Sequence, residues 1–165
     1  MKKPLLNRLT KEELSLVREW RNSDHIKKFA LNQKEITKEQ QSAWFEKIQQ
    51  SEDEYFIISI DEKKCGLIWF NKIEQKILTG FYIYNEELQN SLTPFNIVTT
   101  FHEYLFLKKK FNKIYCKIMP DNKRAIRFNL ALGYKVVEEK SEYSLYELGY
   151  ENYKKSDKKI RKLLK

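Results

Sequence analysis

The period of the apolar residues changes at about position 55, and this change constrains the fold more than any other feature. Before it, Thr10-Lys11-Glu12-Glu13 and Thr37-Lys38-Glu39-Gln40 have the spacing of capping boxes, and apolar residues follow each box at helical intervals. After it, residues 55–60, 66–70 and 77–84 are apolar runs separated by polar turns, which predicts three strands of an antiparallel meander. The chain is therefore predicted to combine helices with a sheet.

The second half of the chain predicts helices that alternate with strands. Thr93 and Pro94 suit the N-cap and the first position of a helix, and residues 122–132 predict another helix that ends at Gly133. Three further strands are predicted at residues 114–119, 134–139 and 143–148. Gly80, in the middle of the third meander strand, indicates a bulge or a close approach of a neighbouring group.

Length and composition restrict the class of protein. The 165 residues suit one domain, and 41% apolar residues are enough to form a core. No apolar run reaches the roughly 20 residues that cross a bilayer, and no apolar stretch typical of a secretory signal follows the first residues. We therefore expect a cytoplasmic protein without a membrane span.

The sulfur and imidazole side chains give no sign of a metal site. Cys65 and Cys116 lie in apolar, strand-like segments, so we expect buried free thiols rather than a disulfide. His25 and His102 are the only histidines, and no spacing of metal ligands occurs. We therefore expect no metal cofactor.

Positive charge is concentrated at the end of the chain. The net charge is +9, and residues 151–165, with seven basic and two acidic side chains, contribute +5 of it. Such a tail is typical of a solvated helix face, so we do not expect a nucleic-acid partner, although the tail could attract an anionic substrate.

Several segments together resemble a known family. Val17-Arg18-Glu19-Trp20-Arg21-Asn22, Ile36-Thr37 and Trp44-Phe45-Glu46-Lys47-Ile48 are similar to the N-terminal half of RimJ/RimL-type enzymes. The run from Asn122 to Tyr134 resembles the late-helix pattern N-x-x-A-x-x-x-Y-x-x-x-G-F. With the order of the predicted elements, these segments resemble the GCN5-related N-acetyltransferases (GNAT), and within them the PseH-like enzymes that acetylate nucleotide-linked amino sugars.

The resemblance implies an α/β (α+β) GNAT fold with a mixed, twisted sheet of about six to seven strands flanked by helices. Residues 1–150 would form the acetyltransferase domain. Residues 151–165 would be a basic helical tail, either part of the same domain or appended to it.

The resemblance also implies a site for acetyl-CoA between the end of the third meander strand and the following helix, where helix N–H groups favour phosphate. The residues that it assigns to the cofactor are Phe81, Tyr82, Ile83, Gln89, Asn90, Ser91, Leu92, Thr93, Asn122 and Asn129. Asn122 could contact the pantetheine arm, cap its helix, or do both.

Arg21 and Asn22, at the end of the first helix, are candidate contacts for the acceptor substrate, because Arg suits phosphate groups, but they could equally brace the following loop. His102 falls on an amphipathic helix and is predicted to be structural. Tyr134 lies near the expected cleft and is predicted to be a core residue. The tryptophans Trp20, Trp44 and Trp69 are also predicted to belong to the core.

The chain departs from the family pattern in three places. Leu92 and Pro94 replace glycines of the phosphate loop, and Pro94 removes one N–H donor. Asn129 stands where a tyrosine often protonates the leaving thiolate. Leu78 stands where a strand carboxylate often acts as the base. No catalytic residue is therefore assigned, and a base such as His25 or a water held by backbone carbonyls is left open.

The function implied is N-acetyl transfer from acetyl-CoA to the amine of a small acceptor, with a nucleotide-linked amino sugar as the first candidate. A RimJ/RimL-like enzyme that acetylates protein N-termini is the second candidate. A third, of another class, is a catalytically degenerate GNAT fold that serves as a binding module. The sequence leaves the oligomeric state open, a homodimer included.

Overall fold

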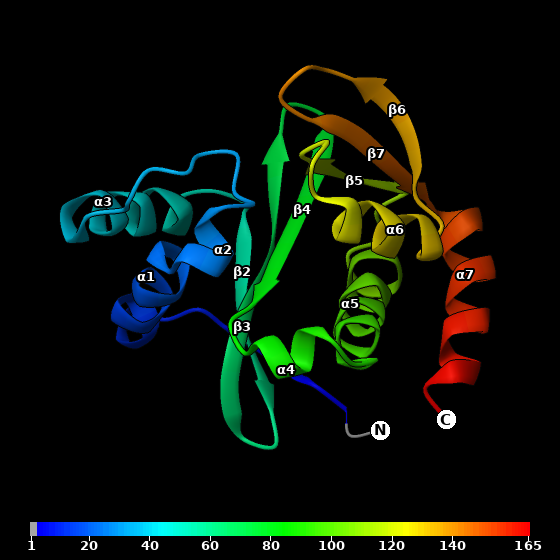
Figure 1. Cartoon of the computed structure of the whole chain (residues 1–165), viewed down its shortest axis with the longest axis horizontal. Helices are drawn as coiled ribbons and strands as arrows, with labels where there is room; N and C mark the ends of the chain where they lie inside the picture. The colour runs from blue at the N-terminus through cyan, green and yellow to red at the C-terminus, as the bar shows by residue number, and fades with distance from the viewer. Residues whose placement is uncertain (1–2) are drawn as a thin grey trace.

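A computed structural model describes residues 3–165, so Met1 and Lys2, the start of the segment expected to lack a secretory signal, lie outside the described residues. A seven-stranded sheet with the order β1-β2-β3-β4-β5-β7-β6 runs through the middle of the molecule, and helices cover both of its faces (Figure 1). Neighbouring strands are antiparallel except for the parallel pair β4 and β5. The mixed α/β fold predicted from the sequence is confirmed.

The strands are Leu5–Arg8 (β1), Glu54–Ile60 (β2), Lys63–Ile73 (β3), Lys76–Ile83 (β4), Lys113–Ile118 (β5), Lys135–Glu139 (β6) and Ser144–Gly149 (β7). The helices are Leu14–Asn22 (α1), Asp24–Lys27 (α2), Lys38–Gln49 (α3), Glu86–Gln89 (α4), Thr93–Glu103 (α5), Lys123–Ala131 (α6) and Tyr150–Leu163 (α7). A 3-10 turn, Lys11–Glu13, precedes α1, and a π-helical turn, Tyr104–Lys108, continues α5.

Capping residues next to each helix determine where most of the helices begin. In the second capping box, Thr37 Oγ1 accepts from the Gln40 N–H at 3.1 Å, and Gln40 Oε1 accepts from the Thr37 N–H at 2.9 Å. The prediction for Thr93 was wrong: Leu92 is the N-cap of α5 and Thr93 is its first residue. The reason is that Ser91 Oγ already accepts from the Thr93 N–H at 3.1 Å and donates to Thr93 Oγ1 at 2.8 Å.

The elements that were not predicted from the sequence include β1 and α4. The edge strand β1 has only four residues, and it forms because it pairs with β2, whose residues lie 48–54 positions away in the sequence. The short helix α4 is capped by Asn85, whose side chain accepts from the N–H groups of Glu87 and Leu88. Gly80 marks a close approach rather than a bulge, because a Cβ there would lie 2.4 Å from the Trp69 ring.

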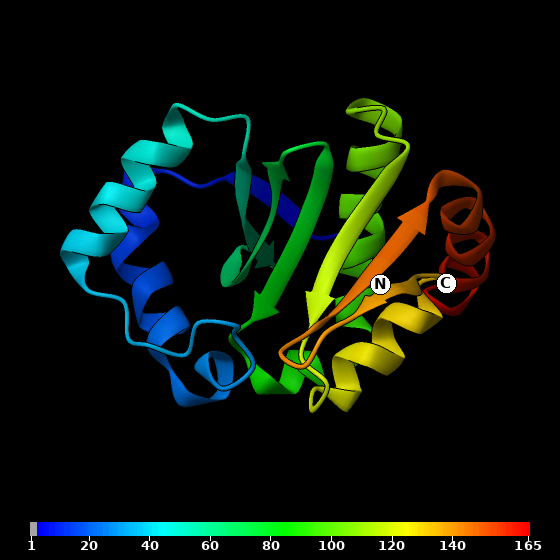
Figure 2. The same cartoon turned by 90° about the horizontal axis from the view of Figure 1, so that it is seen from above.

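The sheet separates two hydrophobic cores. The smaller one lies under α1 and α3 and includes Trp20, with Trp44 and Trp69 packed against it. The larger one lies on the opposite face, under α5–α7 (Figure 2), and includes the free, buried thiols of Cys65 and Cys116. Within residues 3–165, no helix has the length and apolar character that a membrane span requires.

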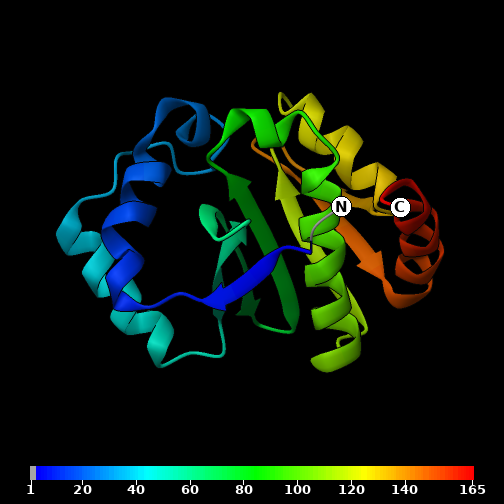
Figure 3. The same ribbon diagram turned by 90° about the horizontal axis from the view of Figure 1, so that it is seen from below.

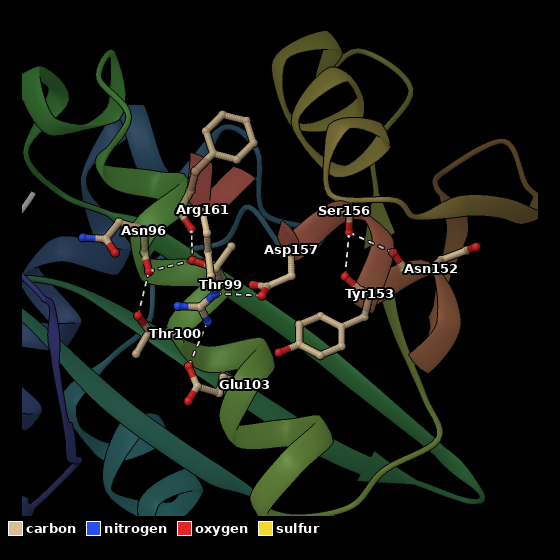
Figure 4. A network of polar contacts seen from close by, with 10 residues as sticks. Asn96, Thr99, Thr100, Glu103, Asn152, Tyr153, Ser156, Asp157 and Arg161 are labelled. Atoms are coloured by element: carbon tan, nitrogen blue, oxygen red, sulfur yellow. Dashed lines mark hydrogen bonds and ion pairs between the residues drawn. The ribbon is translucent and has the colours of Figure 1, made fainter. Parts of the chain in front are cut away.

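Helix α7, which carries the basic tail, packs against α5 and α6. Tyr153 and Ile160 contribute to the larger core. Figure 4 shows Arg161 of α7 at the contact with α5. It donates to Glu103 of α5 at 2.8 Å and to Asp157 of its own helix at 2.7 Å. Ser156 Oγ donates to the Leu132 carbonyl at the end of α6 at 2.6 Å. One side of the tail helix is therefore buried, and most of its basic side chains lie on the exposed side.

Candidate active site

The two parallel strands separate and open a cavity. β4 and β5 pair at a single position, Leu78 with Tyr115. Beyond that pair, residues 79–83 and residues 116–119 line a cavity of about 1050 Å³. Strands that separate leave backbone N–H and C=O groups without a ladder partner, and an extended chain that contains amides can pair with such an edge. This cavity is our candidate active site.

We name the two ends of the cavity by the strands. The closed end is where β4 and β5 meet, at the Leu78–Tyr115 pair. The mouth lies where β4 and β5 end, and Figures 2 and 3 show α2, α4 and the first turn of α6 together at that end of the sheet. Residues of all three helices line the cavity.

The structure brings most of the predicted cofactor residues together. The cavity is lined by Phe81, Tyr82, Ile83, Gln89, Asn90, Ser91, Asn122 and Asn129. Leu92 and Thr93, also predicted, do not line it. The Tyr82 hydroxyl donates to the Val17 carbonyl at 3.4 Å, so this side chain reaches toward α1.

The turn between β4 and α5 has few backbone donors to offer a phosphate. The N–H groups of Asn90 and Ser91 donate to the carbonyls of Glu87 and Leu88, at 3.2 and 3.3 Å. The Thr93 N–H donates to Ser91, and Pro94 has no N–H. Helix α4 therefore uses the amides that a glycine-rich phosphate loop would leave free.

Cationic side chains of α6 supply the phosphate-binding donors that this turn lacks. Arg124 and Arg127 both line the cavity, and Arg124 Nη1 donates to Gln89 Oε1 at 3.2 Å. Guanidinium groups bind phosphate oxygens with good geometry. The free edge of β4 suits a pantetheine arm and these arginines suit phosphates, so the cavity fits acetyl-CoA. The i,i+3 spacing of the two arginines was the signal in the sequence that could have identified them.

Both asparagines of α6 have their side chains held by the protein. Asn122 is the N-cap, and its Oδ1 accepts from the Ala125 N–H at 3.1 Å. Asn129 Nδ2 donates to the Ala125 carbonyl at 2.8 Å, and its Oδ1 accepts from Cys116 Sγ at 3.5 Å. The capping role predicted for Asn122 is confirmed, and the same residue still lines the cavity.

The two residues proposed for the acceptor differ from each other. Asn22 exchanges two hydrogen bonds with the backbone of Ile36, at 2.8 and 2.9 Å, and does not line the cavity, which favours the bracing role. Arg21 lines the cavity and donates through Nη2 to the Asn32 carbonyl, while its Nη1 is buried without a partner among the described residues. Arg21 therefore has a donor to offer a ligand.

The cavity is electropositive. Five of its lining side chains are cations, namely Arg21, Lys28, Lys117, Arg124 and Arg127. Among the described residues, Glu86 is the one carboxylate that lines it. Lys28 and Lys117 were not singled out from the sequence, because their role depends on which segments meet. An anion is favoured throughout this cavity.

The two histidines lie at different ends of the site. His25 is at the mouth, where its Nε2 lies 2.8 Å from the Tyr84 carbonyl and its Nδ1 lies 3.9 Å from Glu86. Six residues of extended chain separate Tyr84 from Leu78, roughly 20 Å, so His25 is remote from the closed end. His102 is buried near the closed end, 3.1 Å from the Tyr134 hydroxyl, and burial lowers its pKa to about 3.

A family model described as an acetyltransferase (GNAT) domain matches residues 5–135. No curated protein sequence matches the chain. Among solved structures, AAC(6')-Ib in complex with ribostamycin and coenzyme A has a TM-score of 0.81 and 15% identity, over 93% of this chain and 97% of that chain. The Campylobacter jejuni N-acetyltransferase PseH has a TM-score of 0.69 and 19% identity, over 90% and 99%. FdhC, a nucleotide-linked sugar GNAT, has a TM-score of 0.77 and 19% identity, over 99% and 96%.

The family match covers most of the chain, and it includes both strands of the cavity and the helix that carries the cationic side chains. The chain therefore belongs to the GNAT acetyltransferase family and is an acetyl-CoA-dependent N-acetyltransferase.

Proposed function

We propose that the acceptor is the amino group of a nucleotide-linked amino sugar. The observation that carries this proposal is the charge of the cavity, in which five cations face a single carboxylate among the described lining residues. Arg124 and Arg127 lie near the phosphate end of the cofactor arm, which leaves Arg21 and Lys28 for a second anionic group. An acceptor that carries a diphosphate matches this surplus.

The similar structures include enzymes for two kinds of acceptor. AAC(6')-Ib is described with aminoglycosides such as ribostamycin, whereas FdhC is described as a nucleotide-linked sugar GNAT. An aminoglycoside carries several positive charges, and a cavity of this charge repels it. The cationic lining therefore supports the anionic class of acceptor.

Aromatic side chains at the acceptor side support the same class. Trp69 and Phe29 both line the cavity, and Phe29 is 44% exposed, with the Lys28 ammonium 4.9 Å from its ring centroid. A nucleobase or sugar ring can stack on such a surface. Lys28 and Phe29 come from the segment between α2 and α3, on the opposite side of the mouth from α6.

The protein residues contribute mainly position and exclusion of water. The free edge of β4 aligns the arm that carries the acetyl group, and the cations near the mouth hold both substrates by their phosphates. The apolar residues of the closed end, among them Leu78 and Phe81, keep water from the thioester. Coenzyme A supplies the acetyl group as a thioester, and the acceptor amine attacks its carbonyl carbon directly.

The test compares kcat/KM for acetyl transfer to a UDP-linked amino sugar, to ribostamycin and to a short peptide with a free N-terminus. We expect the nucleotide sugar to be preferred, and Lys28→Gln to raise its KM several-fold while the KM for acetyl-CoA is unchanged. Lys47→Gln, on the exposed face of α3 and outside the cavity, is the matched control. Preference for ribostamycin or for the peptide would refute the proposal and identify the acceptor class instead.

A further inference from the structure

One face of the sheet forms the acceptor side of the cavity. Arg21, Lys28 and Phe29 line the cavity and come from α1 and from the segment between α2 and α3, on the face that carries the smaller core. Helix α6, whose arginines suit the cofactor phosphates, packs on the opposite face against the larger core. The acceptor amine therefore reaches the thioester from the face that α1 and α3 cover.

Asn71 lies on this face beside Leu78, which stands where the family pattern has a carboxylate. The two residues are direct partners in the antiparallel pair of β3 and β4, and such partners project from the same side of a sheet. Trp69 and its partner Gly80 lie next to them on the same side. All four residues line the cavity. Asn71 therefore brings a polar side chain next to the position of the missing base.

Tyr55 sets the orientation of the Asn71 amide. Asn71 Nδ2 donates to the Tyr55 hydroxyl at 2.7 Å. The Tyr55 ring stacks on Trp69, with centroids 5.8 Å apart and an interplanar angle of 13°, and it meets Trp44 of α3 edge-on at 4.9 Å. Tyr55 itself does not line the cavity. Because the amide nitrogen is directed at this fixed ring, the amide oxygen is left on the side of the cavity.

The Asn71 oxygen has no protein partner. Within residues 3–165, no donor bonds to Asn71 Oδ1. The side-chain oxygens of Thr79, Asn129 and Tyr134, which also line the closed end, all take part in hydrogen bonds with other residues. Asn71 therefore offers a ligand a hydrogen-bond acceptor that these neighbours do not.

We propose that Asn71 binds the acceptor amine: its Oδ1 accepts a hydrogen bond from the amine N–H and thereby directs the nitrogen lone pair at the thioester carbonyl carbon. Asn71 touches the reacting nitrogen and is a catalytic residue, whereas Tyr55 is a positioning residue that holds the amide. This inference rests on the acetyl transfer that family membership shows, and not on the identity of the acceptor.

The Asn71 amide stabilises charge and takes no proton. As the nitrogen bonds to the carbonyl carbon it becomes positively charged, and the negative end of the amide dipole lies against it. The C–S bond then breaks and its electron pair leaves with the sulfur. Water takes the proton that the nitrogen loses and returns one to the thiolate, so an amide and a free thiol are released. In a cavity lined by five cations, a positive nitrogen is otherwise destabilised.

An amide in this place also affects which amines bind in a reactive form. A carboxylate beside the nitrogen would favour the protonated amine and raise its pKa. The uncharged Asn71 oxygen has a smaller effect on the amine pKa, so a weakly basic amine remains neutral and can attack. The side chain at position 71 is therefore expected to influence the choice between weakly and strongly basic acceptors.

The first experiment removes the amide. The acceptor is whichever of the UDP-linked amino sugar, ribostamycin and the peptide the wild type acetylates fastest. Asn71→Ala should lower kcat by roughly 10- to 100-fold, the effect of losing a hydrogen bond to a charged group, with the KM for acetyl-CoA unchanged. Tyr55→Phe, which frees the amide to rotate, should lower kcat less. Asn7→Ala, an exposed asparagine of β1 outside the cavity, is the matched control. Equal kcat for the wild type and Asn71→Ala would overturn the inference.

The second experiment converts the amide to a carboxylate. Asn71→Asp keeps an acceptor for the amine and adds the base that Leu78 does not supply. In a peptide that carries an α-amine and a lysine, the share of product acetylated on the lysine should rise several-fold, and the pH profile of the rate should move to lower pH. A merely structural role for Asn71 would leave the product ratio unchanged, and an unchanged ratio would refute the proposal.

A third experiment needs no turnover and no nucleotide. In wild-type protein saturated with coenzyme A, the ¹⁵N-labelled side-chain amide of Asn71, assigned by its loss in Asn71→Asp, should shift on titration with glucosamine. Glucose, which lacks the amine, should shift it much less. Equal shifts with both sugars, or none with either, would contradict amine binding at Asn71. Because neither probe carries a phosphate, failure of the nucleotide-sugar proposal does not affect this result.

Discussion

Two substitutions of Asn122 can separate its contribution to the stability of the fold from its contact with acetyl-CoA. Its Oδ1 caps α6 through the Ala125 N–H, and the residue also lines the cavity. Asn122→Ala should lower the free energy of unfolding by about 1 kcal/mol through loss of the cap, and should raise the KM for acetyl-CoA. Asn122→Asp keeps an acceptor for the cap but loses the amide donor. If Asn122→Asp binds acetyl-CoA as the wild type does, capping is the whole role of this side chain.

His102 makes the stability of the fold depend on pH. Burial lowers its pKa to about 3, so the folded protein keeps it neutral, whereas the unfolded chain protonates it near 6.5. The unfolded state thus binds one more proton between these values, and the free energy of unfolding should fall as pH decreases from about 6.5, by up to ~1.4 kcal/mol per pH unit. Urea unfolding at pH 7 and pH 5 measures this slope. His102→Gln, which can still donate to Tyr134, should flatten it; an unchanged slope would contradict this assignment.

At the scale of elements, α7 combines a packed face with a charged one. Ile160 is buried in the larger core, whereas Lys159 beside it is exposed. Ile160→Ala should lower the free energy of unfolding by about 2–5 kcal/mol, and Lys159→Ala should change it by less than about 0.5 kcal/mol. Chemical denaturation of the two variants measures both values. A similar, small effect for both would mean that α7 is an appended tail.

At the scale of the whole molecule, the lack of a carboxylate base at the closed end selects the kind of amine that can react. Leu78 leaves the closed end without a carboxylate base, and Glu86 lies at the mouth. Only a neutral amine attacks the thioester. At pH 7 a lysine amine with a pKa near 10.4 is neutral about four times in ten thousand, and an α-amine near 7.8 about one time in seven. This gap of several hundred is comparable to the ~10²–10⁴ that a general base supplies.

We therefore expect weakly basic amines to be preferred, and the rate at low acceptor concentration to rise with pH and level off near the pKa of the acceptor. A peptide that carries both an α-amine and a lysine offers a direct comparison by mass spectrometry of the products. Acetylation mainly on the lysine at neutral pH would show that the site contains an effective base.

The local pattern of the sequence was sufficient to predict most of the elements. The capping box at Thr37 and the stop at Gly133 are contacts within one turn of helix, and the apolar period of the strands reports which face is buried. The family motif from Asn122 to Tyr134 likewise lies on a single helix and its turn. These features depend on neighbours in the chain, so they can be read without the fold.

The tertiary structure decided what depends on distant segments. The single pairing of Leu78 with Tyr115 opens the cavity, and α4 uses the amides that a phosphate loop would offer. Arg124 and Lys28, nearly a hundred residues apart in sequence, line the same cavity. Tyr134, predicted to be a core residue, is indeed buried, but its hydroxyl meets His102 and the cavity lining only because α5 and the end of α6 pack on the same face of the sheet. A sequence pattern records the burial of each side chain, whereas the register of the strands and the packing of the helices determine which polar groups meet.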